Sequence, residues 1–390
     1  MMRKVTFVLI FVFSFQLSKA QQNVITTAVP FLMVAGDARS AGMGDNGVAT
    51  TADAFSQQYN PAKYAFSLER QGFSASYTPY LTQLVNDISL GQVTYFNKYN
   101  ERSAVGASLR YFSLGEIQLT DINGEQLYIV KPNELALDVS YSLKLSDRFA
   151  MAVAGRFISS NLRIQDGSND NRAARSYAVD VAAFYQSEEM AFKDFNGRLR
   201  FGMNMQNLGP KINYDQTQSD VNSNFLPSNL KIGSGFDFIL DDFNKVSLNV
   251  EFAKLMVPTP QDPDLNGDGV ASALEKEENR LAYNKIGWTE GIFKSFNDAP
   301  GGLSEEFQEI TYAVGSEYTY QDSFAFRMGY FHESPAKGAR KFYTLGAGFT
   351  YNVVKIDLSY LFSASRVNNP LENTLRFSLT FNFGDKYEDY

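Results

Sequence analysis

The fold is decided by the stretch Thr374-Leu375-Arg376-Phe377-Ser378-Leu379-Thr380-Phe381-Asn382-Phe383, in which polar and apolar residues alternate without interruption. In a β-strand, a period of two places successive side chains on opposite faces of the sheet. One face of this strand therefore carries five large apolar groups, and the other carries an arginine and small polar groups. Lipid suits the first face, and a watery or plugged barrel interior suits the second face better than the dry core of a sandwich does. The stretch predicts a transmembrane β-strand.

The same alternation recurs along the chain, in residues 135–144, 199–206, 246–253, 343–352 and 356–362. Turn signals between such segments divide the chain into fourteen strands, an even number, as is usual in bacterial outer-membrane barrels. We expect the strands near residues 71–80, 88–97, 103–114, 134–145, 149–164, 175–187, 198–207, 229–241, 245–256, 308–320, 323–333, 342–352, 354–363 and 373–384.

Loop lengths give a second, independent indication of the same fold. Short connections alternate with long ones, and the longest connections, near residues 115–133, 208–228 and 257–306, all fall on one side. Outer-membrane barrels have short periplasmic turns and longer extracellular loops. The sequence therefore predicts an all-β fold: a fourteen-stranded antiparallel transmembrane β-barrel embedded in outer-membrane lipid.

Composition excludes several other classes of protein. The 390-residue chain contains no apolar run of the ~20 residues that a membrane helix needs. Its net charge of −8 argues against a nucleic-acid partner, which favours a basic stripe. The absence of cysteine excludes disulfides, thiolate metal sites, cysteine nucleophiles and a cysteine-linked lipid anchor.

The first twenty residues have the features of a secretory signal peptide. Arg3 and Lys4 precede an apolar segment at residues 5–15, and Ser18 and Ala20 place small residues before the expected cleavage point. Residues 21–70 do not alternate and are rich in glycine and alanine, which indicates a plug. We therefore divide the chain into a signal peptide (1–20), an N-terminal hatch segment (21–70) and an outer-membrane β-barrel (71–390) with a long extracellular loop at 257–307. The expected location is the cell outer membrane.

The hatch segment contains a motif that invites a different interpretation. Gly42, Gly44 and Gly47 spell Gly-x-Gly-x-x-Gly, the dinucleotide-binding fingerprint. That motif indicates nucleotide binding only between a strand and the helix of a βαβ unit, and neither flanks it here. We expect these glycines instead to let the hatch backbone pack tightly inside the barrel.

Two parts of the hatch carry a family resemblance. The run from Asp37 to Thr50, DARSAGMGDNGVAT, and the run from Asn60 to Phe66, NPAKYAF, resemble the N-terminal region of FadL-like outer-membrane barrels, and more specifically of the PorV (LptO) family of the type IX secretion system of Bacteroidetes. The resemblance implies a hatch inside a fourteen-stranded barrel. It also implies a non-enzymatic subunit that binds cargo with a C-terminal signal domain as the cargo leaves a SprA- or Sov-type translocon. Such a subunit delivers the cargo to surface-attachment machinery that includes the sortase-like PorU.

A candidate calcium site lies in the longest outward loop. Residues 264–275 match D-x-[DN]-x-[DN]-G-x5-E at every required position. The expected ligands are Asp264, Asn266, Asp268, the backbone carbonyl of Val270, Ser272 and Glu275. Prolines upstream forbid an entering helix, whereas the residues after 271 favour an exiting one, so the site is at most half an EF-hand. The alternative is a solvated turn built from Asp, Asn and Gly.

Catalysis has no clear basis in the sequence. His332 is the sole histidine and is expected at the outer end of a strand as an interface residue. The inward-facing charged residues are interpreted as braces of the lumen rather than as a catalytic cluster; they include Asp138, Arg156, Glu251, Asp357 and Arg376. No cofactor other than calcium is expected.

Three functional hypotheses follow. The first is the secretion subunit, and the second is a FadL-type channel for small hydrophobic molecules, which rests on fold analogy. The third is an enzyme acting on lipopolysaccharide, which would need a base or nucleophile that the sequence does not display. For the first hypothesis, we expect partners to contact exposed apolar groups of the outer loops. The candidates are Phe225, Leu226, Trp288, Phe293 and Phe296.

Overall fold

The computed structural model describes residues 24–384 and residue 387, apart from positions 83, 122, 163–172, 215–222, 265, 267 and 366–368. The expected signal peptide lies outside the described residues. None of the helices in the described part of the chain is long and apolar enough to cross a membrane.

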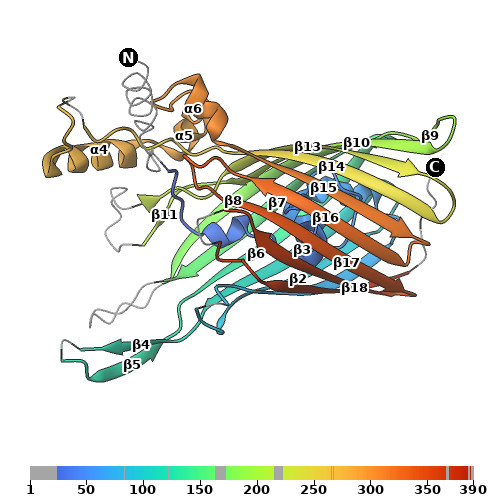
Figure 1. Cartoon of the computed structure of the whole chain (residues 1–390), viewed down its shortest axis with the longest axis horizontal. Coiled ribbons are helices and arrows are strands. Elements are labelled where there is room, and N and C mark those ends of the chain that lie inside the picture. Colours follow the sequence, from blue (N-terminus) through green and yellow to red (C-terminus); the bar gives the residue numbers. More distant parts are fainter. Residues whose placement is uncertain are drawn as a thin grey trace, which may run out of the picture.

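Fourteen antiparallel strands close into one barrel (Figure 1). The first and last of them pair from Gln71 opposite Phe383 onward, and β10 pairs with β13 to complete the ring. Both the strand count and the fold class confirm the prediction. The barrel strands are β1 (Gln71–Pro79), β2 (Ile88–Lys98), β3 (Ser103–Leu114), β6 (Asn133–Ser146), β7 (Phe149–Asn161), β8 (Ala174–Gln186), β10 (Asn196–Leu208), β13 (Asn229–Ile239), β14 (Asn244–Leu255), β15 (Ile310–Tyr320), β16 (Phe324–His332), β17 (Lys341–Tyr351), β18 (Val354–Ser363) and β19 (Leu375–Phe383).

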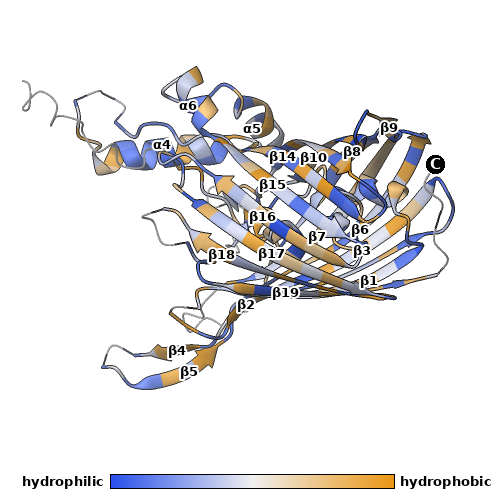
Figure 2. Cartoon of the chain, turned by 45° about the vertical axis from the view of Figure 1, so that its right-hand side comes forward, coloured by the Kyte–Doolittle hydropathy of each residue, from blue (hydrophilic) through white to orange (hydrophobic). Residues whose placement is uncertain are grey.

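The two faces of the barrel differ as the alternation predicts. In β19, the side chains of Leu375 and Phe377 are exposed on the outer surface, whereas Arg376 and Ser378 are buried inside. Figure 2 shows the same alternation of hydrophobic and hydrophilic bands along the other strands. Because the outer face is apolar and the inner face is polar, the barrel presents a lipid-compatible wall around a polar interior.

The two ends of the barrel are unequal. One end has short turns, and the short strand β9 (Met190–Ala191) extends β10 there. The other end, which we call the outer mouth, carries three helices and two small hairpins (Figure 1). These elements are α4 (Ala273–Lys285), α5 (Trp288–Lys294), α6 (Leu303–Gln308), the hairpin β4 (Ile117–Thr120) and β5 (Gln126–Val130), and the pair β11 (Ile212–Asn213) and β12 (Ser223–Asn224).

The hatch fills the barrel between the outer mouth and the start of β1. It consists of four short helices: η1 (Pro30–Met33), α2 (Ala38–Ala41), α3 (Ser56–Tyr59) and η2 (Pro61–Phe66). The amide of Ala28 donates to the carbonyl of Phe225 near the outer mouth, and Arg70 accepts from Lys98 at the opposite end. The hatch therefore runs the length of the lumen from the outer side inward.

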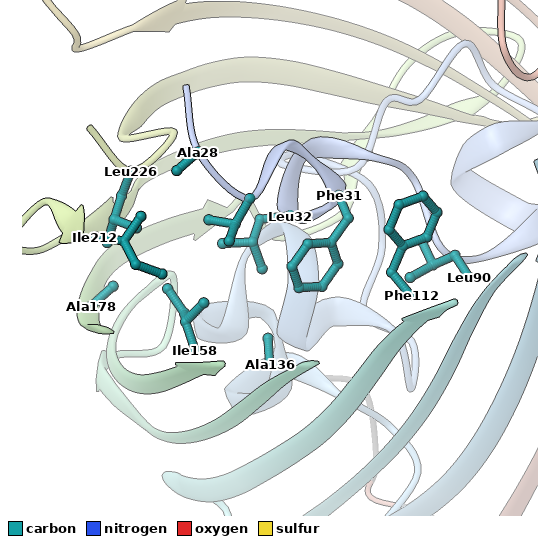
Figure 3. Packing of buried hydrophobic residues seen from close by; sticks show 11 residues of the cluster. Ala28, Phe31, Leu32, Leu90, Phe112, Ala136, Ile158, Ala178, Ile212 and Leu226 are labelled. Carbon is teal, nitrogen blue, oxygen red and sulfur yellow. The ribbon is translucent and has the colours of Figure 1, made fainter. Parts of the chain in front are cut away.

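An apolar cluster joins the hatch to the barrel wall near the outer mouth (Figure 3). Phe31 of η1 stacks on Phe112 of β3 with ring centroids 6.0 Å apart, and Leu90 and Ile158 of the wall are buried beside them. Burial of such side chains stabilises their contact by roughly 1.5–3 kcal/mol each. The interior is thus a packed core and not an open channel at this level.

Candidate functional site

Buried ion pairs fasten the hatch to the barrel wall. Arg39 of α2 contacts Glu317 of β15 at 2.8 Å and Asp53 of the hatch at 2.7 Å. Glu317 also accepts from Arg327 of β16 at 2.6 Å, and Arg327 reaches Asp357 of β18 at 2.8 Å. Removing one partner of a buried pair leaves an uncompensated charge, which is strongly destabilising. Arg39 thus ties α2 to β15, and Arg327 connects the same carboxylate to β18.

A second set of contacts grips the hatch backbone directly. Glu251 of β14 accepts hydrogen bonds from the amides of Gly47 and Val48, both at 2.8 Å. Arg376 of β19 pairs with Asp45 at 3.0 Å. On the opposite wall, the guanidinium of Arg110 donates to the carbonyls of Phe31, Leu32 and Val34 at 2.7–2.9 Å. The wall therefore satisfies hatch backbone groups that would otherwise be buried without partners.

Other inward charges brace the wall, and Arg200 of this set also donates to the Ala49 carbonyl of the hatch at 2.9 Å. Arg156 of β7 pairs with Asp138 of β6 and with Asp180 of β8, and Arg200 of β10 pairs with Asp237 of β13. All five side chains are buried. Each pair connects neighbouring strands, so these residues cross-link the barrel laterally, as barrel lumens commonly do.

The Gly-x-Gly-x-x-Gly motif serves close backbone packing. Gly44 has φ of +75°, and a Cβ there would lie 2.9 Å from the backbone nitrogen of Tyr330. A Cβ on Gly42 would lie 3.1 Å from the Cα of Gly346 in β17. A side chain at either position would push the hatch away from the wall, so the glycines allow the backbones to touch.

A cavity of about 310 Å³ lies between the hatch and the outer ends of β13 to β16. Ile25 and Met33 of the hatch, with Leu255 and Phe331 of the wall, give it an apolar body. Lys231 also lines it, and contacts Glu251 at 3.2 Å. Its volume is at the small end of the range for ligand pockets.

An ion cluster ties helix α6 to the barrel. Lys254 of β14 contacts Glu306 of α6 at 2.9 Å and Glu309 at 2.6 Å, and Lys337 contacts Glu309 at 2.9 Å and Glu305 at 2.5 Å. Burial favours the neutral form of Glu306, but the Ala299 amide and the Lys254 ammonium outweigh it and lower its pKa. Helix α6 is therefore fixed relative to the barrel wall.

The expected calcium ligands lie in the loop before α4. Asp264 accepts from the amides of Asp268 and Gly269 at 3.2 and 2.8 Å, and Asp268 accepts from the amide of Val270 at 2.8 Å. Within the residues that the structure describes, no group of three His, Cys, Asp or Glu side chains is close enough to hold a metal ion.

The far end of the same loop forms a helix cap. Ser272 caps α4, and Glu275 reciprocates by accepting from the Ser272 amide at 2.9 Å, a capping box. The amide of Asn266 donates to Glu275 at 3.2 Å, so the loop folds back onto Glu275, its last acidic residue. The exiting helix confirms the expectation from composition, and calcium binding stays a prediction.

Two of the expected partner-binding residues are not exposed, and the expectation of their exposure is wrong. Phe225 is 5% exposed, because its ring packs edge-on against Tyr283 of α4 at 5.6 Å between centroids and lies beside Gly291 of α5. Leu226 is 1% exposed, because it belongs to the apolar cluster between hatch and wall. Their role in partner binding stays untested.

The other three expected residues lie on α5 or directly after it. Trp288 is half-buried at the start of the helix, Phe293 is 80% exposed and Phe296 is exposed. We call the helices α4 to α6 and their connections the helical cap of the outer mouth. Sequence reasoning missed two further exposed apolar residues of this helical cap, Leu303 and Phe307 of α6. The sequence signal that could have found them is their apolar character within an acidic segment that favours a helix.

His332 lies at the outer end of β16, as expected. Its ring stacks on Tyr312 with centroids 4.7 Å apart, and its Nδ1 lies 3.1 Å from the hydroxyl of Tyr330. Tyr343 packs against Tyr330 from the next strand. The histidine is therefore part of an aromatic group at the barrel rim, as interface girdles are.

Comparison with known proteins identifies the family. The family model described as "Type IX secretion system protein PorV" matches residues 17–262, which include the hatch and the barrel strands β1 to β14. The chain belongs to the PorV family. The matched residues end before the candidate calcium loop, so the family match gives no information about that site. None of the curated proteins that were compared matches the chain.

Solved structures confirm the fold at low sequence identity. The Pseudomonas putida toluene transporter TodX is 11% identical, with a TM-score of 0.51 over 90% of this chain and 99% of TodX. A TodX mutant, a monoaromatic hydrocarbon channel, is 12% identical, with a TM-score of 0.50 over 89% and 99% of the two chains. A FadL homologue of Pseudomonas aeruginosa is 14% identical, with a TM-score of 0.45 over 90% and 99%. The chain thus shares the barrel fold of the two TodX structures and is an outer-membrane protein of the PorV family of type IX secretion.

Proposed function

We propose that this PorV-family protein binds secreted cargo through its extracellular surface, without passing anything through its lumen. The cargo would carry a C-terminal signal domain and arrive from a SprA- or Sov-type translocon. The protein would then deliver it to PorU-type attachment machinery, acting as a non-enzymatic subunit.

The observation that supports this proposal most strongly is the anchoring of the hatch. Wall residues on opposite sides of the barrel, Arg110, Glu251 and Glu317, hold the hatch by buried ion pairs and backbone hydrogen bonds. A lumen closed in this way does not offer a continuous path. Binding partners are therefore left with the outer mouth, where helix α6 is fixed to the barrel by the Lys254 and Lys337 ion cluster.

The surface of the helical cap fits a protein partner. Phe293 of α5 and Phe307 of α6 are 80% and 71% exposed, and α6 is tied to the wall by Lys254. Large exposed apolar groups on an ordered surface mark interaction sites, and buried aromatic anchors dominate the energetics of many protein interfaces.

A binding experiment tests the proposal. The detergent-extracted protein is immobilised and probed with the purified C-terminal signal domain of a secreted protein. Phe293→Glu combined with Phe307→Glu should weaken binding at least tenfold, because both substitutions place charge in an apolar contact. The matched control is Phe243→Glu, which places the same charge on an exposed phenylalanine of the turn between β13 and β14, at the opposite end of the barrel. Unchanged binding by the double variant, or equal loss in the control, would contradict the assignment of the cap.

One observation favours the second hypothesis, a channel or carrier for small hydrophobic molecules. The cavity beside Met33 and Leu255 has an apolar body and lies at the outer mouth. Native mass spectrometry of the freshly extracted protein distinguishes the secretion subunit from the channel or carrier. A stoichiometric small apolar ligand together with failure to bind the signal domain would favour the carrier over the secretion subunit.

A further inference from the structure

The hairpin formed by β4 and β5 projects away from the barrel at the outer mouth in both views (Figures 1 and 2). The sequence predicts residues 115–133 only as one of the long outward connections. Instead, Ile117 pairs with Val130 and Gln118 pairs with Ile129 in a two-stranded sheet of its own. Within the described chain, neither strand joins the barrel sheet.

The strand β5 differs from every barrel strand in its pattern. Leu127, Tyr128 and Ile129 are three successive large apolar residues, and they are 57%, 39% and 52% exposed. Successive residues point to opposite faces of a strand, so both faces of the hairpin are apolar and exposed. A barrel strand needs one such face for lipid, whereas this hairpin has two and lies beyond the wall.

The outer edge of β5 carries neither charge nor proline. Natural sheets protect exposed edges with charged residues, proline or bulges. A bulge in β5 places Leu127 and Tyr128 opposite the single residue Leu119, but no charged residue and no proline lies between Gln126 and Val130. An isolated two-stranded hairpin is at best marginally stable in water. A third strand added to this edge would satisfy its backbone groups and cover its side chains.

The base of the hairpin holds it in this outward position. Asp87 of the β1–β2 loop accepts from the amide of Glu116 at 2.8 Å, and Lys131 pairs with Glu116 at 2.5 Å. Gly115 has φ of +79°, and a Cβ there would lie 2.3 Å from an Asp87 oxygen. These contacts constrain the base of the hairpin and so fix the direction in which it projects.

The membrane is a poor partner for this hairpin. Open sheet edges do not occur in the hydrocarbon region, because their backbone groups would lack hydrogen-bond partners there. The tip is also acidic: Glu125 is exposed and Asp121 is partly exposed. A partner strand that is apolar opposite Leu127 to Ile129 and basic near the tip fits both features.

We propose that β5 pairs edge to edge with an exposed apolar edge strand of a β-sheet domain in the secreted cargo. This inference rests on the proposed function, because it takes the partner to be cargo. The hairpin lies on the far side of the outer mouth from α4 to α6 (Figure 1), so a single compact domain seated over the hatch contacts the helices on one side and gains a strand on the other.

Photo-cross-linking in cells tests the pairing. A benzophenone amino acid replaces Tyr128, with the same replacement at Tyr351, an exposed residue at the end of β17 farthest from the outer mouth, as the control. The expected result is an adduct at position 128 alone, which peptide mapping places in an edge strand of a secreted protein. An adduct with lipid, an adduct with a second copy of this chain, or no adduct would overturn the proposal.

Charge substitutions separate this inference from the proposed function. Leu127→Lys combined with Ile129→Lys should weaken binding of the purified signal domain at least tenfold, whereas Tyr351→Lys, at the end of β17 farthest from the outer mouth, should change it less than twofold. Heat-dependent gel mobility checks that each barrel is folded. Full binding by the β5 variant would overturn the pairing and leave cargo binding intact. Failure of the unsubstituted protein to bind the domain would overturn the proposed function itself.

Discussion

The hatch and the elements of the outer mouth are both built on the same barrel, but they use their side chains in opposite ways. Hatch side chains and backbone groups are bound inside the barrel: Arg39 pairs with Glu317 of the wall and with Asp53 of the hatch, and the amides of Gly47 and Val48 donate to Glu251. The elements of the outer mouth instead leave large apolar groups such as Phe293 and Ile129 exposed. The comparison separates a closed interior, which supplies stability, from an outer surface that is left to bind partners.

The largest expected effect comes from breaking the buried ion pair that holds the hatch to the wall. Glu317→Ala leaves both Arg39 and Arg327 without their shared carboxylate, and breaking a buried pair costs about 3–5 kcal/mol. We expect faster amide hydrogen exchange in residues 36–60 and a lower unfolding temperature. The control is Glu188→Ala, which breaks the exposed pair with Arg148 and should cost about 0–1 kcal/mol. Equal effects of the two substitutions would show that the hatch is not held by this contact.

A smaller effect is expected from added volume at the interface between hatch and wall. A Cβ at Gly329 of β16 would lie 2.1 Å from the backbone nitrogen of Gly44, so Gly329→Ala should destabilise the docked hatch by about 1–3 kcal/mol through overpacking. Gly155→Ala in β7 is the matched control, because a Cβ there meets no atom within 4 Å. Thermal unfolding of both variants measures the difference, and a neutral Gly329→Ala would argue against close backbone packing.

The smallest expected effect concerns calcium. If residues 264–275 bind the ion, millimolar calcium should slow hydrogen exchange in that loop and leave the barrel unchanged, since the loop lies outside the sheet. Asp268→Ala should abolish the slowing, and Asp121→Ala in the β4–β5 turn should not. Identical exchange with calcium and with a chelator would support the solvated turn.

The sequence predicted the barrel well because a strand's alternation is local. For Arg376 and Phe377, the lipid and lumen faces follow from position along one strand, and no distant contact is needed. The glycine packing of the hatch was also predictable, because tight backbone approach is what Gly44 permits.

Contacts between distant segments were not predictable. Phe225 is buried because α4 and α5 fold back over it, which depends on the path of a segment some sixty residues later in the chain. The hairpin at β4 and β5 was missed because its two apolar faces do not alternate. The pairing of Arg39 with Glu317 likewise joins residues 278 positions apart.

The central claim is that the protein works at its outer surface with the hatch closed. Because the chain has no native cysteine, a single engineered disulfide between Ala38→Cys and Ser378→Cys can lock the hatch to β19; the Ala38 amide and the Ser378 hydroxyl oxygen are 2.8 Å apart. Secretion and binding of the signal domain are then compared in the oxidised and reduced forms, with each single cysteine variant as a control. The account predicts equal activity in both forms. Loss of activity only in the oxidised form, restored by reduction, would contradict it and show that the hatch must move.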